Sequence, residues 1–355
     1  MKTYKIAAIP GDGIGSEVIS AGVEVLQTMA SQGGNFKVEV ETFPWGADYY
    51  FEHGQMMPDD GRETLKPFDA IYFGSAGDPR IPDHITLWQL RLNICQGFEQ
   101  YANVRPTRVL PGVKSPLADI GPGDFDWVIV RENSEGEYAG VGGRAHQNFA
   151  EEVAMDVSVF TRAGVERIQR FALELARSRP RKQLTLVTKS NAQRHGMVMW
   201  DDCFARIKEE YPDVTTDKML VDAMTTRMVL DPASLDVIVA TNLHADILSD
   251  LAAALSGSLG IAPTANLRPE GDFPSMFEPI HGSAFDIMGQ GIANPIGSFW
   301  SAVMMLEHLG EKASAEQLMT AIETVTAAGE VMPRDLGGTA STREVTDAVL
   351  KALDY

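Results

Sequence analysis

The sequence predicts an α/β protein of two domains with a largely parallel core sheet. Apolar, strand-like runs alternate with helical patterns along the whole chain, which is typical of βαβ units. The chain has 355 residues, too many for one ordinary hydrophobic core. Polar residues directly follow several of the strand-like runs. Because parallel sheets carry their chemistry at the carboxyl ends of strands, we expect the functional residues there.

The elements follow from the local patterns of apolar residues. The first strand is predicted at residues 4–11, and it leads into a helix from about Ser16 to Ser31. Two further strands are predicted at residues 37–43 and 69–77, and an apolar helical pattern covers 247–257. The remaining predicted strands each end in polar, functional-looking residues: 127–133, 183–191 and 235–242.

Two segments rich in proline and glycine predict the domain crossings. They lie at residues 105–126 and 260–272. The chain is therefore expected to fold as an outer domain built from both ends, residues 1–106 and 262–355, with a central domain, residues 107–261, inserted into it.

Composition limits the classes of function. The net charge of −19 disfavours nucleic acid, although a local arginine cluster can still attract a small anion. No apolar run approaches the ~20 residues that span a bilayer, and the N-terminus lacks the features of a signal peptide. Two cysteines, Cys95 and Cys203, are too few for a disulfide scaffold or a zinc cluster. We expect a cytoplasmic protein that binds neither nucleic acid nor membrane.

Three aspartates indicate a metal site. Asp246 and Asp250 lie where a predicted strand runs into a predicted helix, and Asp222 follows another strand-like run. At a spacing of four residues, two carboxylates point from one helix face and repel each other unless a cation lies between them. Three carboxylates at strand ends favour a hard divalent ion, Mg²⁺ or Mn²⁺. The alternative is a solvated helix N-terminus, which favours aspartate in any case.

Two glycine-rich stretches indicate a nucleotide site. Residues 11–15, GDGIG, allow a dinucleotide-binding interpretation with Glu39 or Glu41 as the ribose acid. Their spacing is GxGxG rather than GxGxxG, so a tight strand-to-helix turn is the alternative. The second stretch, residues 277–298, could bring backbone amides close to phosphates, with Asp286 accepting hydrogen bonds from both ribose hydroxyls. A structured loop around a buried histidine is the alternative there.

Other polar residues offer proton transfer and anion binding. Tyr138 beside cations can act as an acid, and Lys189 near a metal ion and an arginine can act as a base. Taken alone, a buried structural tyrosine and an exposed surface lysine are the commoner cases. Arg105, Arg131 and Arg91 are candidates for clamping a carboxylate, because a planar guanidinium meets a carboxylate with two hydrogen bonds.

A series of motifs in order along the chain resembles the β-decarboxylating dehydrogenases, the isocitrate and isopropylmalate dehydrogenase type. The motifs are GDGIG, RENSEGEYAG, TKSN, LVDAM, NLHADILSD, HGSAFDIMGQGIANPIG and RDLGGTASTREV, so the resemblance covers nearly the whole chain. The segments GSAGDPRIPDHITLWQLR and FEQYANVRP are most similar to the branch that acts on tartrate and D-malate.

The resemblance implies the isocitrate/isopropylmalate dehydrogenase-like fold, which is not a Rossmann fold, and a homodimer with shared active sites. Lys189 and Asp222 would reach in from the partner subunit, while Asp246 and Asp250 complete the metal site. The outer domain would mainly bind NAD, and the central domain would carry the metal site and the dimer interface. A K⁺ requirement is a further expectation. The implied cofactor contacts are Gly74, Asn191, His281, Gly282, Ser283, Ala284, Asp286 and Asn294.

The resemblance also implies the roles of the remaining residues. Lys189 would assist deprotonation of the substrate's C2 hydroxyl as a hydride passes from C2 to NAD⁺. Tyr138 would protonate C3 after the loss of CO₂, and Arg105 and Arg131 would hold the carboxylate that leaves. One departure is that Cys95 replaces an arginine usual in the family. Arg91 lies one helical turn earlier, so we expect it to supply the missing cation or to bind a substrate hydroxyl.

The expected function is the NAD-dependent and metal-dependent oxidation of tartrate and oxidative decarboxylation of D-malate. An arginine at position 91 favours such a short hydroxylated diacid over a branched apolar substrate. The alternatives are a 3-isopropylmalate dehydrogenase and a non-catalytic regulatory subunit of the same family. A binding-only subunit would not need both Tyr138 and Lys189, which argues against the last.

Overall fold

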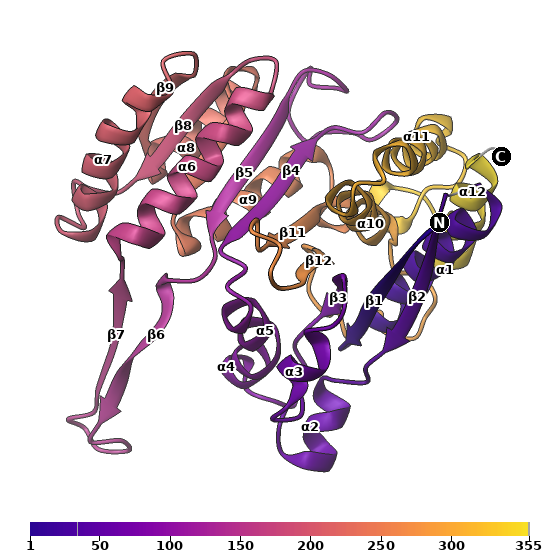
Figure 1. Cartoon of the computed structure of the whole chain (residues 1–355), viewed down its shortest axis with the longest axis horizontal. Coiled ribbons are helices and arrows are strands. Elements are labelled where there is room, and N and C mark those ends of the chain that lie inside the picture. The colour runs from indigo at the N-terminus through magenta and orange to yellow at the C-terminus, as the bar shows by residue number, and fades with distance from the viewer. Residues whose placement is uncertain (34, 354–355) are drawn as a thin grey trace. The chain divides into compact units, whose positions relative to one another are not determined.

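A computed structural model describes residues 1–33 and 35–353 of the chain (Figure 1). The chain divides into two compact units, each built from separated segments. Both chain ends belong to unit 1. The segments are Met1–Gln100, Arg105–Asp124 and Ala253–Tyr355 in unit 1, and Tyr101–Val104 and Phe125–Ala252 in unit 2.

The boundaries differ from those expected from the sequence. Residues 107–124 and 253–261 were expected in the central domain, but they belong to unit 1. They are tied to each other: Ser115 Oγ donates to the carbonyl of Leu255 at 2.7 Å. A Cβ on Gly257 would lie 2.4 Å from Val113 Cγ1. The proline- and glycine-rich residues 105–124 therefore belong to unit 1, and the chain passes from them into unit 2 after Asp124 and returns after Ala252.

Unit 1 contains a mixed sheet. β1 pairs in parallel with both β2 and β3, and β12 pairs in parallel with β3. β11 and β12 are antiparallel, so this pair departs from the expected parallel arrangement. The strands are β1 (Lys2–Gly11), β2 (Phe36–Thr42), β3 (Ala70–Ser75), β11 (Pro263–Leu267) and β12 (Ser275–Pro279).

Helices cover the sheet of unit 1. The predicted first helix is confirmed as α1, Gly15–Gln32, which packs on β1, and α10 packs on β11 and β12. One turn, Leu87–Arg91, is a π-helix between α4 and α5. The other helical segments are α2 (Ala47–His53), α3 (Gly61–Leu65), α4 (Asp83–Thr86), α5 (Leu92–Gly97), Leu259–Ile261, α10 (Ile296–Leu309), α11 (Lys312–Ala328), Arg334–Leu336 and α12 (Thr342–Ala352).

Unit 2 contains a parallel sheet in the order β5-β10-β8-β9. Its strands are β5 (Asp126–Glu132), β8 (Gln183–Thr188), β9 (Thr215–Leu220) and β10 (Val237–Ala240), and β4 (Ala102–Arg108) is divided between the units. Three of these strands fall where the sequence predicts them. The helices are α6 (Arg162–Ser178), α7 (Gly196–Ile207), Lys208–Glu210, α8 (Val221–Leu230) and Pro232–Ser234. α9 (Asn242–Ser256) begins in unit 2 and is divided between the units after Ala252.

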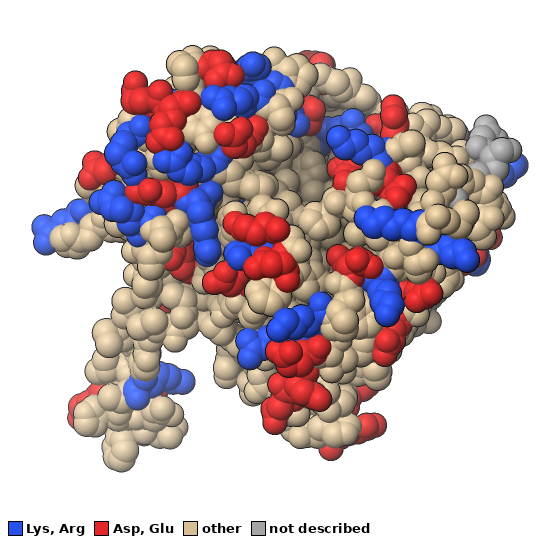
Figure 2. Space-filling model, viewed as in Figure 1, with Lys and Arg blue, Asp and Glu red and all other residues tan. Residues whose placement is uncertain are grey.

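A two-stranded antiparallel hairpin extends from unit 2. It consists of β6 (Gly136–Ala145) and β7 (Val153–Val159) (Figure 1). Figure 2 shows mostly uncharged side chains on its surface. Large apolar side chains are exposed along it, among them Met155 at 60% and Val153 at 57%. The sequence does not predict this hairpin. In the described part of the chain, no helix has the length and apolar character needed to cross a membrane.

Candidate active site

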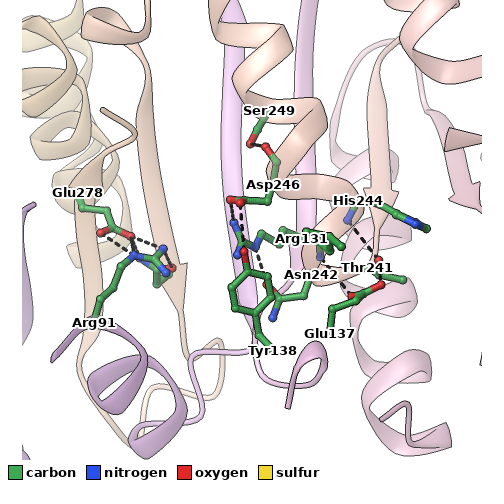
Figure 3. A network of polar contacts seen from close by, with 12 residues as sticks. Arg91, Arg131, Glu137, Tyr138, Thr241, Asn242, His244, Asp246, Ser249 and Glu278 are labelled. Carbon is green, nitrogen blue, oxygen red and sulfur yellow. Dashed lines mark hydrogen bonds and ion pairs between the residues drawn. The ribbon is translucent and has the colours of Figure 1, made fainter. Parts of the chain in front are cut away.

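A buried arginine organises polar side chains in unit 2 (Figure 3). Arg131 lies one residue before the end of β5, and its side chain is only 3% exposed. Its Nε donates to Asn242 Oδ1 at 2.8 Å, and its Nη1 donates to Asp246 Oδ1. Asn242 and Asp246 lie on the first two turns of α9, directly after β10. These bonds join the carboxyl end of β5 to α9, the helix that follows the neighbouring strand β10.

Tyr138 belongs to the same cluster. Its hydroxyl donates to Asp246 Oδ2 at 3.3 Å, and the Arg131 guanidinium lies 5.2 Å from the centre of its ring. Figure 3 shows the three side chains pointing toward one another. The neighbouring Glu137 accepts hydrogen bonds from Thr241 Oγ1 and from the amide of Leu243, both at 3.2 Å. These bonds fix the start of β6, and with it Tyr138, against the N-terminus of α9.

The candidate base is paired with a candidate metal ligand. Lys189 directly follows β8, and its Nζ lies 2.6 Å from Asp222 Oδ1. Asp222 is the second residue of α8, and its side chain is 66% exposed. The hydrogen bond from Lys189 lowers the pKa of Asp222. Asp222 therefore stays ionised over a wide pH range.

A single copy of the chain does not bring Asp222, Asp246 and Asp250 together within the described residues. In residues 1–33 and 35–353, no group of three His, Cys, Asp or Glu side chains is arranged to hold a metal ion. Asp246 contacts Arg131, Asp222 contacts Lys189, and Asp250 is exposed on α9. Carboxylate oxygens are the donors that Mg²⁺ and Mn²⁺ prefer, so the donor chemistry fits. A three-carboxylate site would need Asp222 from a second copy of the chain.

In unit 1, Arg91 forms a buried ion pair rather than facing solvent (Figure 3). Its Nη2 lies 2.6 Å from Glu278 Oε1, and its Nε donates to both carboxylate oxygens at 3.0 Å. Asn266 Nδ2 donates to the same carboxylate at 2.7 Å. Burial alone would raise the pKa of Glu278, but Arg91, Asn266 and the charge of Arg105 outweigh it and lower that pKa.

The residue that replaces the family arginine lies in the core. Cys95 is fully buried in an apolar cluster that includes Trp45 and Phe98. Arg105 is also buried, at 5% exposure, and close enough to Glu278 to affect its pKa. Two arginines of unit 1 therefore surround one carboxylate, although position 95 contributes no charge.

The stretch after β12 borders a cavity in unit 1 of about 320 Å³. Its apolar wall includes Ile14 and Ile287. His281 contributes Nε2, which is buried and has no hydrogen-bond partner among the described residues. Burial lowers the pKa of His281, so the ring is neutral. Its Nδ1 lies 3.0 Å from the carbonyl oxygen of Gly282, which only accepts, so Nδ1 carries the proton and Nε2 can accept a hydrogen bond. Asn294 donates to Asp335 Oδ2 at 2.9 Å at the same cavity. Apolar walls with a few polar groups fit an adenine ring.

The GDGIG turn packs directly on this stretch. Gly13 has φ +57, and a Cβ there would lie 1.9 Å from the Ser283 carbonyl oxygen, so only glycine fits. The amide of Ile14 donates to that carbonyl at 2.8 Å. Ala284 has φ +39, an unfavourable conformation for a residue with a Cβ. The first glycine-rich segment thus serves as a tight strand-to-helix turn, and the second carries the strain.

The remaining predicted cofactor residues lie at three places. Gly74 is buried in β3, where a Cβ would lie 2.1 Å from the Pro10 carbonyl oxygen, so packing alone requires glycine. Gly282 and Asp286 are exposed in the loop after β12. Asn191 is exposed in unit 2, two residues after Lys189. Their contacts with a cofactor stay predictions.

The sequence did not reveal the partners that hold the predicted residues. Five residues each accept a hydrogen bond from a predicted site residue or from its supporting helix: Asn242, Glu278, Asn266, Asp335 and Glu137. Two of them carried a usable signal. Asn242 lies at the end of a predicted strand, and Glu278 is the second residue of the glycine-rich stretch 277–298.

The chain matches the isocitrate/isopropylmalate dehydrogenase family over residues 5–349 and belongs to that family. A probable tartrate dehydrogenase/decarboxylase of Agrobacterium vitis is 67% identical over 99% of this chain and 98% of that protein. The decarboxylating D-malate dehydrogenase of Escherichia coli is 50% identical over 99% of both chains. The crystal structure of isocitrate dehydrogenase from Methylococcus capsulatus superposes with a TM-score of 0.88 at 33% identity, over 99% of both chains. The predicted family and fold are confirmed.

Proposed function

We propose that the protein catalyses the NAD-dependent and divalent-metal-dependent oxidation of tartrate and oxidative decarboxylation of D-malate. The observation that carries the proposal is the contact of Asp246 with both Arg131 and Tyr138. A candidate metal ligand, a carboxylate-binding cation and a proton donor meet in one cluster. The names of the relatives from Agrobacterium vitis and Escherichia coli support the choice of substrates.

The side chains of the cluster have distinct roles in this proposal. Arg131 holds a substrate carboxylate, and its bonds to Asn242 and Asp246 fix the plane of its guanidinium. Tyr138 supplies a proton to C3 from its hydroxyl, and the nearby cation favours release of that proton. Lys189 removes the proton of the C2 hydroxyl. Arg105 contributes a second cation for the carboxylate that leaves.

The cofactors supply what these side chains cannot. A divalent ion held by Asp246, Asp250 and Asp222 of a second subunit would act as the Lewis acid, with Mn²⁺ and Mg²⁺ both suited to carboxylates. NAD would accept the hydride, with its adenine in the cavity of His281 and Asn294. A requirement for K⁺ is part of the proposal. Unit 1 is then the main cofactor-binding unit.

A homodimer with shared active sites is the proposed assembly, with its interface on unit 2. The exposed apolar residues of the β6–β7 hairpin support it, since a monomer would leave them in water. Ile247 on α9 and Leu230 on α8 are likewise 54% and 77% exposed. With only two cysteines in 355 residues, a location in the reducing cytoplasm is the matching proposal.

The substrate range is the direct test. NADH formation should be measured with D-malate, the tartrate stereoisomers, 3-isopropylmalate and isocitrate, each with Mn²⁺ or Mg²⁺. We expect kcat/KM to be highest for D-malate or a tartrate and to require the metal. The highest value for 3-isopropylmalate would favour the isopropylmalate dehydrogenase alternative. Binding of NAD and acid without any reduction would favour the regulatory subunit.

A further inference from the structure

The residue after Lys189 takes part in a second set of polar contacts within unit 2. Ser190 Oγ donates to Asp201 Oδ2 at 2.7 Å. Lys218 Nζ donates to the same oxygen, also at 2.7 Å. Ser190 follows β8, Asp201 lies on α7 and Lys218 lies on β9. One carboxylate oxygen therefore joins three elements beside the candidate base.

The placement of Asp201 is costly for a carboxylate. Its side chain is 16% exposed, and its second oxygen, Oδ1, is buried without a hydrogen-bond partner in the described part of the chain. Leaving a buried polar atom unsatisfied costs free energy, and burying a charge costs more unless it is paired. The bonds from Ser190 and Lys218 to Oδ2 offset this cost. Such an arrangement calls for a function beyond packing.

The backbone at Lys189 is held on its other side as well. The carbonyl of Lys189 accepts hydrogen bonds from the amides of Ala192 and Gln193, both at 2.9 Å. Residues 191–195 are exposed, so packing does little to hold this turn. Lys189 Nζ nevertheless lies 2.6 Å from Asp222 Oδ1. The hydrogen bond from the Ser190 hydroxyl to Asp201 holds the residue next to Lys189 in the sequence, so it can fix the direction of the Lys189 side chain.

We infer that Asp201, together with Lys218, is a positioning residue for the proposed reaction: it holds Ser190 and thereby directs Lys189 toward Asp222 and the substrate. The inference rests on the proposed function of Lys189 as the base. Lys218 Nζ lies 2.7 Å from Asp201 Oδ2 and balances the charge of this largely buried carboxylate. Accurate placement matters, because a displacement of about 1 Å in a catalytic group can lower the rate on the order of 10²-fold.

Kinetics of four variants test this role. We expect Ser190→Ala and Asp201→Asn each to lower kcat for D-malate about tenfold, with KM changed by less than about twofold, since a mispositioned base slows only the chemical step. The primary isotope effect with C2-deuterated D-malate should rise in both. Ser190→Thr keeps the hydroxyl and should retain near-normal kcat. Asp202→Asn changes an exposed neighbour on the same helix and is the matched control.

Hydrogen exchange gives a readout that needs no substrate. The amides of Ala192 and Gln193 should exchange about tenfold faster in Ser190→Ala and Asp201→Asn, but not in Asp202→Asn, because the turn loses one of its supports. Unchanged exchange overturns the inference, whether or not the enzyme is active. Unchanged kcat and isotope effect in an active enzyme overturn it too. A wild-type protein inactive on D-malate and tartrate would instead refute the proposed function.

Discussion

Replacing Arg91 with leucine removes the cation bound to a buried carboxylate. The Arg91 and Glu278 side chains are 12% and 6% exposed, and their closest atoms are 2.6 Å apart. Without the guanidinium, Glu278 keeps the hydrogen bond from Asn266 and the charge of Arg105. A carboxylate that is left buried and only partly compensated destabilises the native state.

The size of the effect follows from burial. Removing one partner of a buried ion pair costs about 3–5 kcal/mol, whereas an exposed pair contributes about 0–1 kcal/mol. Because Asn266 and Arg105 remain, we expect a loss near the lower limit, about 3 kcal/mol in the free energy of unfolding. Arg343→Leu is the matched control. Arg343 is paired with Glu24 and is 52% exposed, so its loss should cost about 1 kcal/mol or less.

Urea denaturation of the purified variants measures both values. Adding Glu278→Gln to Arg91→Leu should recover at least about half of the lost stability, because the uncompensated charge disappears with the carboxylate. Equal losses for Arg91→Leu and Arg343→Leu would refute the reasoning, as would a double variant no more stable than Arg91→Leu. The same Arg91→Leu protein should show a raised KM or a lowered kcat/KM for tartrate. Unchanged kinetics would refute a role of Arg91 in substrate binding.

Three shorter tests address the proposed chemistry and one helix. Tyr138→Phe keeps the ring beside Arg131 but removes the hydroxyl, so D-malate turnover, followed as NADH, should fall about 10²-fold or more with an unchanged melting temperature. Dialysis against a chelator should abolish NADH formation, and added Mn²⁺ should restore it. Ser341 caps α12 through a reciprocal bond pair with Glu344, so Ser341→Ala should lower the unfolding free energy in urea by about 1 kcal/mol.

The helices and strands of the fold were predictable where the apolar residues of a single element form a regular pattern. The predicted strand at residues 4–11 and the helix after it lie within β1 and α1, and the helical pattern at 247–257 lies within α9 except for Gly257. The hairpin at residues 136–159 was not predictable in the same way. Its apolar residues face water rather than a core of the same chain, so their pattern does not correspond to a buried face. The π-turn at Leu87–Arg91 was missed because one inserted residue leaves no mark in apolar spacing.

The candidate site was predictable as a set of residue types but not as a set of contacts. Strand ends identified Arg131 and Lys189, since the carboxyl ends of parallel strands carry polar side chains. Their partners lie far along the chain: 111 residues separate Arg131 from Asn242, and 187 separate Arg91 from Glu278. The spacing of residues within one helix or strand gives no information about contacts between residues so far apart in the chain. The interpretation of Arg91 as a substrate residue therefore did not anticipate its buried partner.

The last prediction concerns Glu132, the residue after Arg131 at the end of β5. Its carboxylate is 1% exposed and accepts hydrogen bonds from the amides of Ser134 and Glu135. Burial outweighs these bonds and raises its pKa from 4.5 to about 7. Between those two values the folded protein binds a proton that the unfolded chain releases, so stability falls as the pH rises. Below pH 4.5 this loss is absent, and above about pH 7 it is complete.

The size of the Glu132 effect follows from the two pKa values. Each pKa unit corresponds to about 1.4 kcal/mol, so the full loss is about 3 kcal/mol. Glu132→Gln cannot titrate, and its unfolding free energy relative to wild type should therefore rise by about this amount between pH 4.5 and pH 8. Subtracting the unfolding free energy of the wild type removes the contribution of every other titrating group that the substitution leaves unchanged. Glu151→Gln, at an exposed position in the same unit, is the matched control. A flat difference for Glu132→Gln would mean that the pKa of Glu132 is not raised above 4.5 in the folded protein, and the bonds from Ser134 and Glu135 would then balance or outweigh burial.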